Sequence, residues 1–239
     1  MAETFSESWF HAPGLTAIGE TYALPEDEAH HLRKVLRIEA GRQVIASDGA
    51  GGVFLCATRM RAGAFELEAQ EIHGRPAPAP RLHLALSLLK GRDLEEPVDA
   101  LCQLEVACIH ILTTEHTSEF KGQDHARLLE RLRAKSLVGL KQAKKAWLTA
   151  IEAPRPLEAW RGAHSDLDVV VLHPGPDRLP PPSDRGLALL CGPEGGLSDR
   201  ELERLHTAGA YAMGLGDTRI RAVHAPLLAA GKLMGLGRS

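Results

Sequence analysis

Two stretches near the end of the chain decide the fold: GPEGGLSDRELE (192–203) and LGDTRIRAVHA (215–225). Each follows a short apolar run, at 187–190 and 211–215, that is typical of a strand buried on both faces of a parallel sheet. A third stretch of this kind, LHPG (172–175), ends the apolar run at 167–172. Because ligands of α/β sheets bind beyond the carboxyl ends of the strands, we expect these three strand ends to form one binding site.

The glycines of the first stretch indicate a particular backbone geometry. Gly192, Gly195 and Gly196 allow a sharp turn and a close approach of backbone to a ligand, and Glu194 places one carboxylate among them. A tight connection from strand to helix would need similar residues, so the glycines alone leave that alternative open. No GK[ST] triplet follows and the pattern is not GxGxxG, which excludes a Walker loop and leaves a dinucleotide site unsupported.

Composition narrows the class of protein. The chain has 239 residues, is 44% hydrophobic and 25% charged, and carries a net charge of −3. Its four cysteines form no CxxC pair, which argues against a disulfide scaffold or a zinc knuckle, and we expect no metal. The first residues lack the basic and apolar regions of a secretory signal, and no apolar run approaches the length of a membrane span. These features predict a cytoplasmic protein with no membrane partner.

The segment RPAPAP (75–80) divides the chain, because alternating prolines favour an extended spacer. We predict domains at 1–75 and 76–239. The first domain should contain a helix from Pro25 that is stopped by Gly41, and strands at 43–47, 53–58 and 65–69, which together suggest a small β-barrel. The second should alternate strands and helices in a mainly parallel α/β sheet. Its expected strands are 82–88, 107–112, 167–172, 187–190 and 211–215, and its expected helices are 94–105, 124–143, one capped by Ser198 with Glu201, and 221–236.

Basic residues gather in two places despite the negative total charge. Seven lie between Arg127 and Lys145, with one acid among them, and a second cluster surrounds Arg33 and Arg37. Phosphate contacts depend on such local fields. A solvated helix face would show the same pattern, so charge alone leaves both interpretations open.

Taken together, these motifs resemble the end of the SPOUT methyltransferases, α/β proteins whose chain closes in a trefoil knot. The closest resemblance is to the RsmE-type enzymes, which methylate N3 of a uridine in small-subunit ribosomal RNA. HHLRKVLRIEAG (30–41) looks like that family's PUA-like N-terminal domain, and LLKGRDLE (88–95) like its strand-to-helix turn. The resemblance spans nearly the whole chain and implies a SPOUT-type knotted domain after a PUA-like β-barrel, with S-adenosylmethionine as cofactor.

The resemblance also implies roles for individual residues. Arg221 would stabilise the uracil anion that forms on loss of the N3 proton, with Arg219 as second candidate. Apart from the resemblance, His224 lies one helical turn from Arg221 and could serve as the base, although a lone histidine at a helix start is more often structural. RNA would contact Arg33, Arg37, Lys141, Gln142, Lys144 and Lys145. The cofactor would be held by Leu172, His173, Leu190, Gly192, Pro193, Glu194, Gly195, Gly196, Leu215, Gly216 and Ile220.

Several substrate-side residues depart from the family's pattern. Its LRTETA-like segment reads IRAVHA (220–225), without the glutamate and both hydroxyls, and its EQS-like segment reads KQAKK (141–145). The departures keep two alternatives open: an RNA-binding paralogue without methyltransferase activity, and a SPOUT methyltransferase with a different RNA target. SPOUT proteins are typically homodimers, so the resemblance also predicts a second copy of this chain as partner, beside ribosomal RNA.

Overall fold

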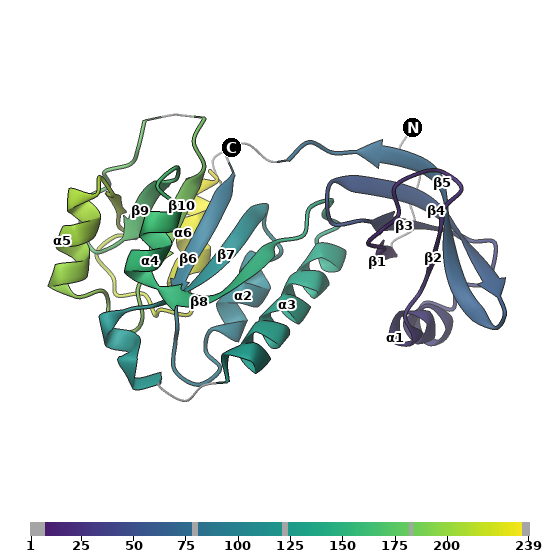
Figure 1. The fold of residues 1–239 in the computed structure, drawn as a ribbon, viewed down its shortest axis with the longest axis horizontal. Helices are drawn as coiled ribbons and strands as arrows, with labels where there is room; N and C mark the ends of the chain where they lie inside the picture. The colour runs from purple at the N-terminus through teal and green to yellow at the C-terminus, as the bar shows by residue number, and fades with distance from the viewer. Residues whose placement is uncertain (1–7, 78–80, 121–123, 182–183, 236–239) are drawn as a thin grey trace. The chain divides into compact units, whose positions relative to one another are not determined.

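We describe a computed structural model of the chain, covering residues 8–77, 81–120, 124–181 and 184–235. The chain forms two compact units, one made of residues 1–77 and 140–148 and the other of residues 78–139 and 149–239. The strands and helices of both are labelled in Figure 1. In the described residues, every helix is too short or too polar to cross a lipid bilayer.

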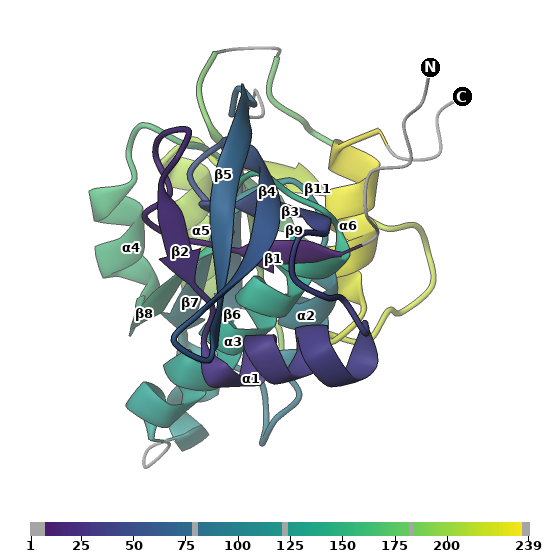
Figure 2. The same cartoon turned by 90° about the vertical axis from the view of Figure 1, so that its right-hand side faces the viewer.

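The first unit is built on one curled five-stranded sheet in the order β1-β3-β4-β5-β2, which Figure 2 shows with α1 beneath it. The strands are β1 (Trp9–His11), β2 (Thr21–Ala23), β3 (Gln43–Ser47), β4 (Gly52–Arg61) and β5 (Ala64–Gly74). β1 pairs with β3 in parallel, and the other neighbours are antiparallel. Ala62 and Gly63 connect β4 to β5 with positive φ at both positions, the conformation that suits a two-residue hairpin turn.

Helix α1 (Glu26–His30) continues as a π-helical turn (His31–Val35) and closes this sheet. Pro25 precedes it and three acids fill its first turn, where the positive end of the helix dipole stabilises them. Leu32 is fully buried in a core with Phe10, Phe54 and Leu67. The predicted strand at 43–47 is therefore confirmed, and so is the start of the helix after Pro25. The helix was expected to continue to Gly41 but ends at Val35, and Arg37 takes a positive φ of 52° that no helix accepts. The three-residue strands β1 and β2 were not predicted.

Residues 140–148 complete the first unit. Ser47 donates its hydroxyl hydrogen bond to the carbonyl of Ala146 (3.0 Å), and the Trp147 indole donates to the carbonyl of Arg75 (3.0 Å). Trp147 packs so closely on Gly51 that a Cβ there would lie 2.5 Å from the ring. The boundary predicted at 75–76 lies two residues before the observed one, and residues 78–80 of the proline segment fall outside the described residues. Residues 140–148 were predicted to belong to the second domain, and this was wrong, because Ala146 and Trp147 pack against the sheet of the first unit.

The second unit is a six-stranded sheet in the order β11-β9-β10-β6-β7-β8, in which all paired neighbours run parallel. This confirms the mainly parallel α/β sheet. The strands are β6 (Leu82–Ser87), β7 (Val106–Thr113), β8 (Ala150–Pro156), β9 (Asp168–Leu172), β10 (Leu187–Cys191) and β11 (Tyr211–Met213). β9 and β10 are almost wholly apolar because both of their faces are covered.

Helices cover both faces of this sheet (Figure 1). One core cluster joins the sheet to α2 (Glu95–Leu101), α3 (His125–Gln142) and α6 (Ala225–Leu233). The opposite cluster contains Leu112, Trp160 and Leu205, and so joins it to α4 (Leu157–Ala163) and α5 (Asp199–Thr207). A 3-10 turn (Glu115–Phe120) follows β7. Ser198 caps α5 and forms the predicted capping box with Glu201.

In the second unit, two predicted helices differ from the observed ones. The helix expected at 94–105 ends at Leu101, so α2 is shorter than predicted. The final helix was expected from Arg221 but begins at Ala225, since Pro226 in its first turn fixes the start and residues 222–224 form a turn. Leu236, its predicted end, lies outside the described residues.

Candidate active site at three strand ends

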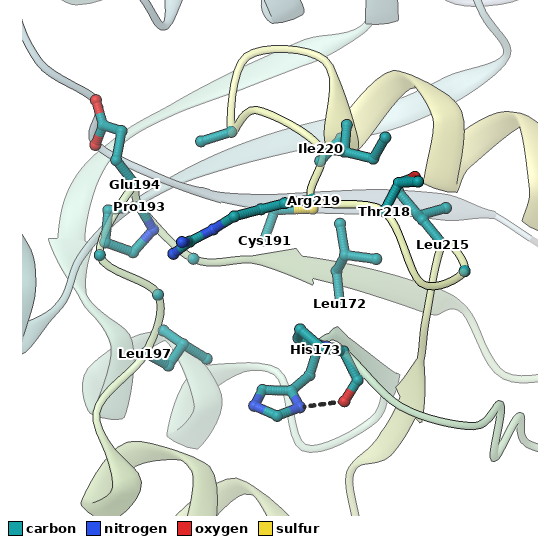
Figure 3. A pocket seen from close by; sticks show the side chains of 17 residues that line it. Leu172, His173, Cys191, Pro193, Glu194, Leu197, Leu215, Thr218, Arg219 and Ile220 are labelled. Carbon is teal, nitrogen blue, oxygen red and sulfur yellow. Dashed lines mark hydrogen bonds between the residues drawn. The ribbon is translucent and has the colours of Figure 1, made fainter.

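The carboxyl ends of β11, β9 and β10 meet at one edge of the second sheet, because these strands are neighbours in that order. The segments that follow them enclose a cavity of about 320 Å³ (Figure 3). That volume falls within the range of small-molecule and cofactor sites. The structure thus brings together the three stretches that the sequence singled out.

Ten of the eleven residues predicted to hold a cofactor line this cavity: Leu172, His173, Gly192, Pro193, Glu194, Gly195, Gly196, Leu215, Gly216 and Ile220. Leu190 does not, because it sits in the middle of the sheet between β9 and β6 and its side chain is fully buried. Sequence reasoning did not place Pro174, Leu197, Thr218, Ala222 and Ala225 in the lining. In the sequence, the one sign that these residues belong to the site is that they stand next to the glycine-containing stretches.

The loop after β10 folds back tightly on itself. The Gly196 amide donates to the carbonyl of Pro193 (2.9 Å), and Gly196 has a φ of +74°. A Cβ at Gly192 would lie 3.1 Å from the Leu197 nitrogen and 3.2 Å from the Gly196 carbonyl carbon. Glycine at position 192 is therefore what allows the turn to close against the strand end.

Polar contacts fix the other two strand ends. The His173 amide donates to the carbonyl of Met213 (3.0 Å), which ties the end of β9 to the end of β11. The Nδ1 of His173 lies 2.9 Å from the carbonyl of Pro174, as the dashed line in Figure 3 marks. Since a carbonyl only accepts, this contact requires a proton on the Nδ1 of His173.

Glu194 turns its carboxylate away from the cavity (Figure 3) and accepts a hydrogen bond from the Lys90 amide (3.1 Å). Lys90 belongs to the turn between β6 and α2, so Glu194 connects that turn to the glycine loop. Cys191 lines the cavity, but burial raises the pKa of its thiol. A thiol held protonated is a poor nucleophile, which supports a packing role for Cys191.

Two arginines stand at the mouth of the site. Arg219 lines the cavity, and its side chain extends across it in the direction of Pro193 (Figure 3). Arg221 lines an adjoining cavity of about 310 Å³, together with Asp93, Glu194 and Arg219. In the described part of the chain neither guanidinium forms a salt bridge. Both are exposed and free to meet an anionic group on a substrate.

The predicted RNA-binding residues all belong to the first unit. Arg33 lies over the Phe65 ring (5.3 Å to its centroid), and Arg37, Gln142 and Lys144 are exposed. Lys141 is half-buried in an ion pair with Glu28. Lys145 is only 3% exposed, which removes its side chain from a surface contact in this structure.

Family models match most of the chain. The model described as "RNA methyltransferase domain" matches residues 75–234, and "RNA methyltransferase PUA domain" matches residues 24–57. The chain belongs to the RNA methyltransferase family. The cavity described above therefore lies in the methyltransferase domain, and the first unit of this methyltransferase contains its PUA domain.

Curated relatives of the methyltransferase share a quarter of its residues. "Ribosomal RNA small subunit methyltransferase E" of Synechocystis is 27% identical, over 92% of this chain and 74% of that protein. The protein of the same name from Mycobacterium tuberculosis is 26% identical, over 93% and 89%. Both matches extend over more than nine tenths of this chain, so these relatives resemble it in the methyltransferase domain and in the PUA domain.

Solved structures have the same fold. A Legionella pneumophila methyltransferase in complex with bound SAM superposes with a TM-score of 0.82 and 24% identity, covering 95% of this chain and 96% of that one. The ribosomal RNA small subunit methyltransferase E of Neisseria gonorrhoeae, bound to S-adenosyl methionine, gives 0.82 and 21%, covering 95% and 97%. These similarities establish the fold of the methyltransferase.

Proposed function

We propose that the protein methylates N3 of a uridine in small-subunit (16S) ribosomal RNA with S-adenosylmethionine as donor. The observation that carries the proposal is the convergence of three strand ends on one cavity, with exposed Arg219 in its lining and exposed Arg221 in the adjoining cavity. The related proteins named as ribosomal RNA small subunit methyltransferase E support the choice of substrate.

The cavity fits the proposed cofactor. Its walls are mostly backbone and apolar side chains, which suit a neutral adenine ring that is read by peptide N–H and C=O groups. Gly195 and Gly216 contribute no side chain, so the backbone can approach the ligand. When bound, S-adenosylmethionine supplies a methyl group activated by its sulfonium.

The protein's own residues must then hold the uracil and stabilise its charge. Loss of the N3 proton leaves an anion spread over O2 and O4, and a guanidinium at the cavity mouth would lower the energy of that anion. We assign this role to Arg221, with Arg219 as the second candidate. His224 is a candidate base; it is exposed, and its Nδ1 lies 3.7 Å from Glu96.

Substrate binding is assigned to the first unit. The exposed side chains of Arg33, Arg37, Gln142 and Lys144 would contact phosphates and position the RNA without reading its sequence. Such contacts should make binding depend steeply on salt.

We further propose a knotted chain end and a homodimer, as in SPOUT enzymes. The placement of β9 between β11 and β10 is compatible with the knot. On α6, Leu227 and Leu228 are 37% and 51% exposed, which would suit a contact with a second copy. Sedimentation of the wild type and of Leu228→Asp tests the dimer: wild-type protein that sediments as a monomer would exclude it.

The central test combines cofactor binding with product mapping. Small-subunit RNA or particles lacking the modification are incubated with labelled S-adenosylmethionine, and the modified nucleotide is located by mass spectrometry. We expect 3-methyluridine, and Arg221→Ala should lower kcat by about 10²- to 10³-fold while leaving cofactor affinity unchanged. Arg219→Ala is measured in parallel, and Arg200→Ala, an exposed arginine on α5, is the matched control.

Each alternative has its own outcome in this experiment. Cofactor binding without methyl incorporation into any ribosomal RNA would identify a binding protein and reject the enzyme. Methylation of another nucleotide would retain the enzyme and reject the uridine N3 target. Full activity of Arg221→Ala, with loss in Arg219→Ala, would transfer the catalytic role to Arg219.

A further inference from the structure

A cluster of polar side chains lies inside the second unit, on the face of the sheet that α4 covers. His83 on β6, Cys108 and His110 on β7 and Glu152 on β8 point to this face, because their neighbours along each strand (Leu84, Ile109 and Ile151) belong to the opposite core. His164 follows the end of α4, which packs on β7 and β8 (Figure 1). The strand ends of the methyltransferase site contribute none of these residues.

Hydrogen bonds link three of these side chains, and a ring contact adds His164. His110 stands directly opposite Glu152 in the β7–β8 register, and its Nδ1 lies 2.9 Å from the Glu152 carboxylate. Its Nε2 lies 3.1 Å from the Nδ1 of His83. The His164 ring meets the His110 ring edge-on, with 4.5 Å between centroids. One nitrogen each of His110 and His164 and one oxygen of Glu152 lie within 4.8 Å of one another.

We propose that His110, Glu152 and His164 form a binding site for a divalent transition-metal ion of the Zn²⁺ class. Two imidazole nitrogens and one carboxylate oxygen form a ligand set that Zn²⁺ accepts, with a fourth position left for water. Ligand atoms around tetrahedral Zn²⁺ stand roughly 3.4 Å apart. A modest closure of the half-buried Glu152 and His164 side chains onto the fixed His110 would reach that spacing.

The hydrogen bonds of each histidine leave a lone pair where the metal needs one. His164 Nδ1 lies 2.9 Å from the carbonyl of Trp160, which can only accept, so the proton is on Nδ1 and the lone pair on Nε2. His110 can move its proton to Nε2 and donate it to His83 Nδ1, which frees Nδ1 for the ion. His83 then orients the ligand ring, as outer partners of metal-bound histidines commonly do.

The electrostatic surroundings favour the required protonation states. Burial lowers the pKa of His110 and takes that of His83 to about 4, which favours the neutral form of both rings. Burial is the largest single effect and opposes ionisation of Glu152, but the hydrogen bond from His110 and the charges around the carboxyl, Arg155 among them, together lower its pKa. Arg155 pairs with Glu152 at 3.5 Å and is 39% exposed, so it can move into solvent when a cation binds. Arg81 and Asp166 lie near His83 with opposite charges.

Cys108 offers a second, competing set with His83 and His110. Burial raises the pKa of its thiol to about 12, which opposes formation of the thiolate that a metal requires. Two of the three ligands in the second set, Cys108 and His110, are buried, whereas in the first set only His110 is buried and Glu152 and His164 are half-buried. An ion would therefore reach the second set less readily. The half-buried set is therefore the better site.

The experiment measures metal uptake by the full-length protein after removal of bound metals with a chelator. Zn²⁺ is titrated against a chromophoric indicator, and Co²⁺ is used for its visible absorption in low-symmetry nitrogen and oxygen sites. We expect one ion per chain and a rise in Tm with Zn²⁺. His164→Ala and Glu152→Gln should each weaken binding by more than about tenfold, with metal-free Tm values close to that of the wild type.

Two matched variants distinguish this site from diffuse surface binding and from the set that contains Cys108. His206→Ala removes an exposed histidine of α5 and should leave affinity unchanged, as should Cys108→Ser. Absence of stoichiometric uptake, or uptake that survives both His164→Ala and Glu152→Gln, would overturn the proposal. Equal loss in His206→Ala would do so too, by indicating that surface histidines take up the ion. A thiolate band with Co²⁺ that Cys108→Ser abolishes would replace the proposed ligand set with the second one.

Discussion

The most informative perturbation is Gly214→Ala, at the end of β11. A Cβ on Gly214 would lie 2.3 Å from the carbonyl oxygen of Gly175, which belongs to the segment after β9. To restore ordinary van der Waals contact, the Gly175 oxygen would have to move away from the new Cβ by about 1 Å. Side chains cannot absorb the clash, because both partners are backbone. The two strand ends that form one wall of the cofactor cavity would have to separate.

The magnitude follows from the cost of overpacking, about 1–3 kcal/mol. If the loops part, a bound cofactor must draw them together again, and that cost becomes a Kd weaker by about 5- to 150-fold. If they stay closed, the strain lowers Tm instead, by about 2–4 °C per kcal/mol. Two hydrogen bonds hold the loop and oppose relaxation: the Gly214 amide donates to the Asp177 carboxylate (3.1 Å), and Lys232 donates to the Gly214 carbonyl (2.9 Å).

Isothermal titration calorimetry with S-adenosylmethionine and a thermal melt measure the two quantities. Gly162→Ala in α4 is the control, because a Cβ there meets nothing within 4 Å. It should keep the wild-type Kd and gain about 0.5–1 kcal/mol of stability. Wild-type Kd together with wild-type Tm in Gly214→Ala would refute the reasoning that backbone contact shapes the cavity.

Three further predictions concern stability and RNA binding. Ser198→Ala removes the N-cap of α5 and should lower the free energy of unfolding by about 1 kcal/mol, measured by urea denaturation; an unchanged midpoint would contradict the capping role. Hydrogen bonds from Arg92, then from Arg131, lower the pKa of Glu95 from 4.5 to about 2, so its ionised form stabilises the fold above pH 4.5 and that stability is lost as the pH falls toward 2. Glu95→Gln should therefore cost about 1–2 kcal/mol at pH 7, after allowance for the exposed Arg92, and the difference from the wild type should vanish near pH 2; a pH-independent difference would reject the linkage. Lys144→Glu should weaken RNA binding and reduce its salt dependence, with no change in cofactor Kd, whereas an unchanged salt slope would exclude a phosphate contact.

Periodicity predicted most of the fold because burial imposes it. The strand at 43–47 was predicted at its observed bounds, and the long helix α3 within one residue. β8 was not predicted, because Pro154, Pro156 and the charged Arg155 are untypical of a strand. They are tolerated here because β8 lies at the edge of the sheet, where the backbone groups on one side have no neighbouring strand to pair with. β1 and β2 are three residues each, too short for any period to show.

The candidate site was predictable where backbone geometry demands glycine. Gly192 and Gly196 revealed the loop, since few other residues fit its turns. Leu190 was assigned to the site through the family resemblance, and its place in the parallel ladder between β9 and β6 leaves it outside the cavity lining. The burial of Lys145 could not be predicted, because a run of basic residues does not indicate which of their side chains is buried. His110, Glu152 and His164 come from three separate elements, which spacing along the chain cannot connect.

The divided first unit has a consequence for synthesis. A nascent chain of 77 residues would present Ile45 and Val53 without Ala146, which packs against them, and Ser47 without its acceptor. Domains usually fold as they leave the ribosome, amino end first. Here the PUA-containing unit must wait until residue 148 has emerged, so translation of α3 and its following turn sets the earliest moment at which that unit can finish folding.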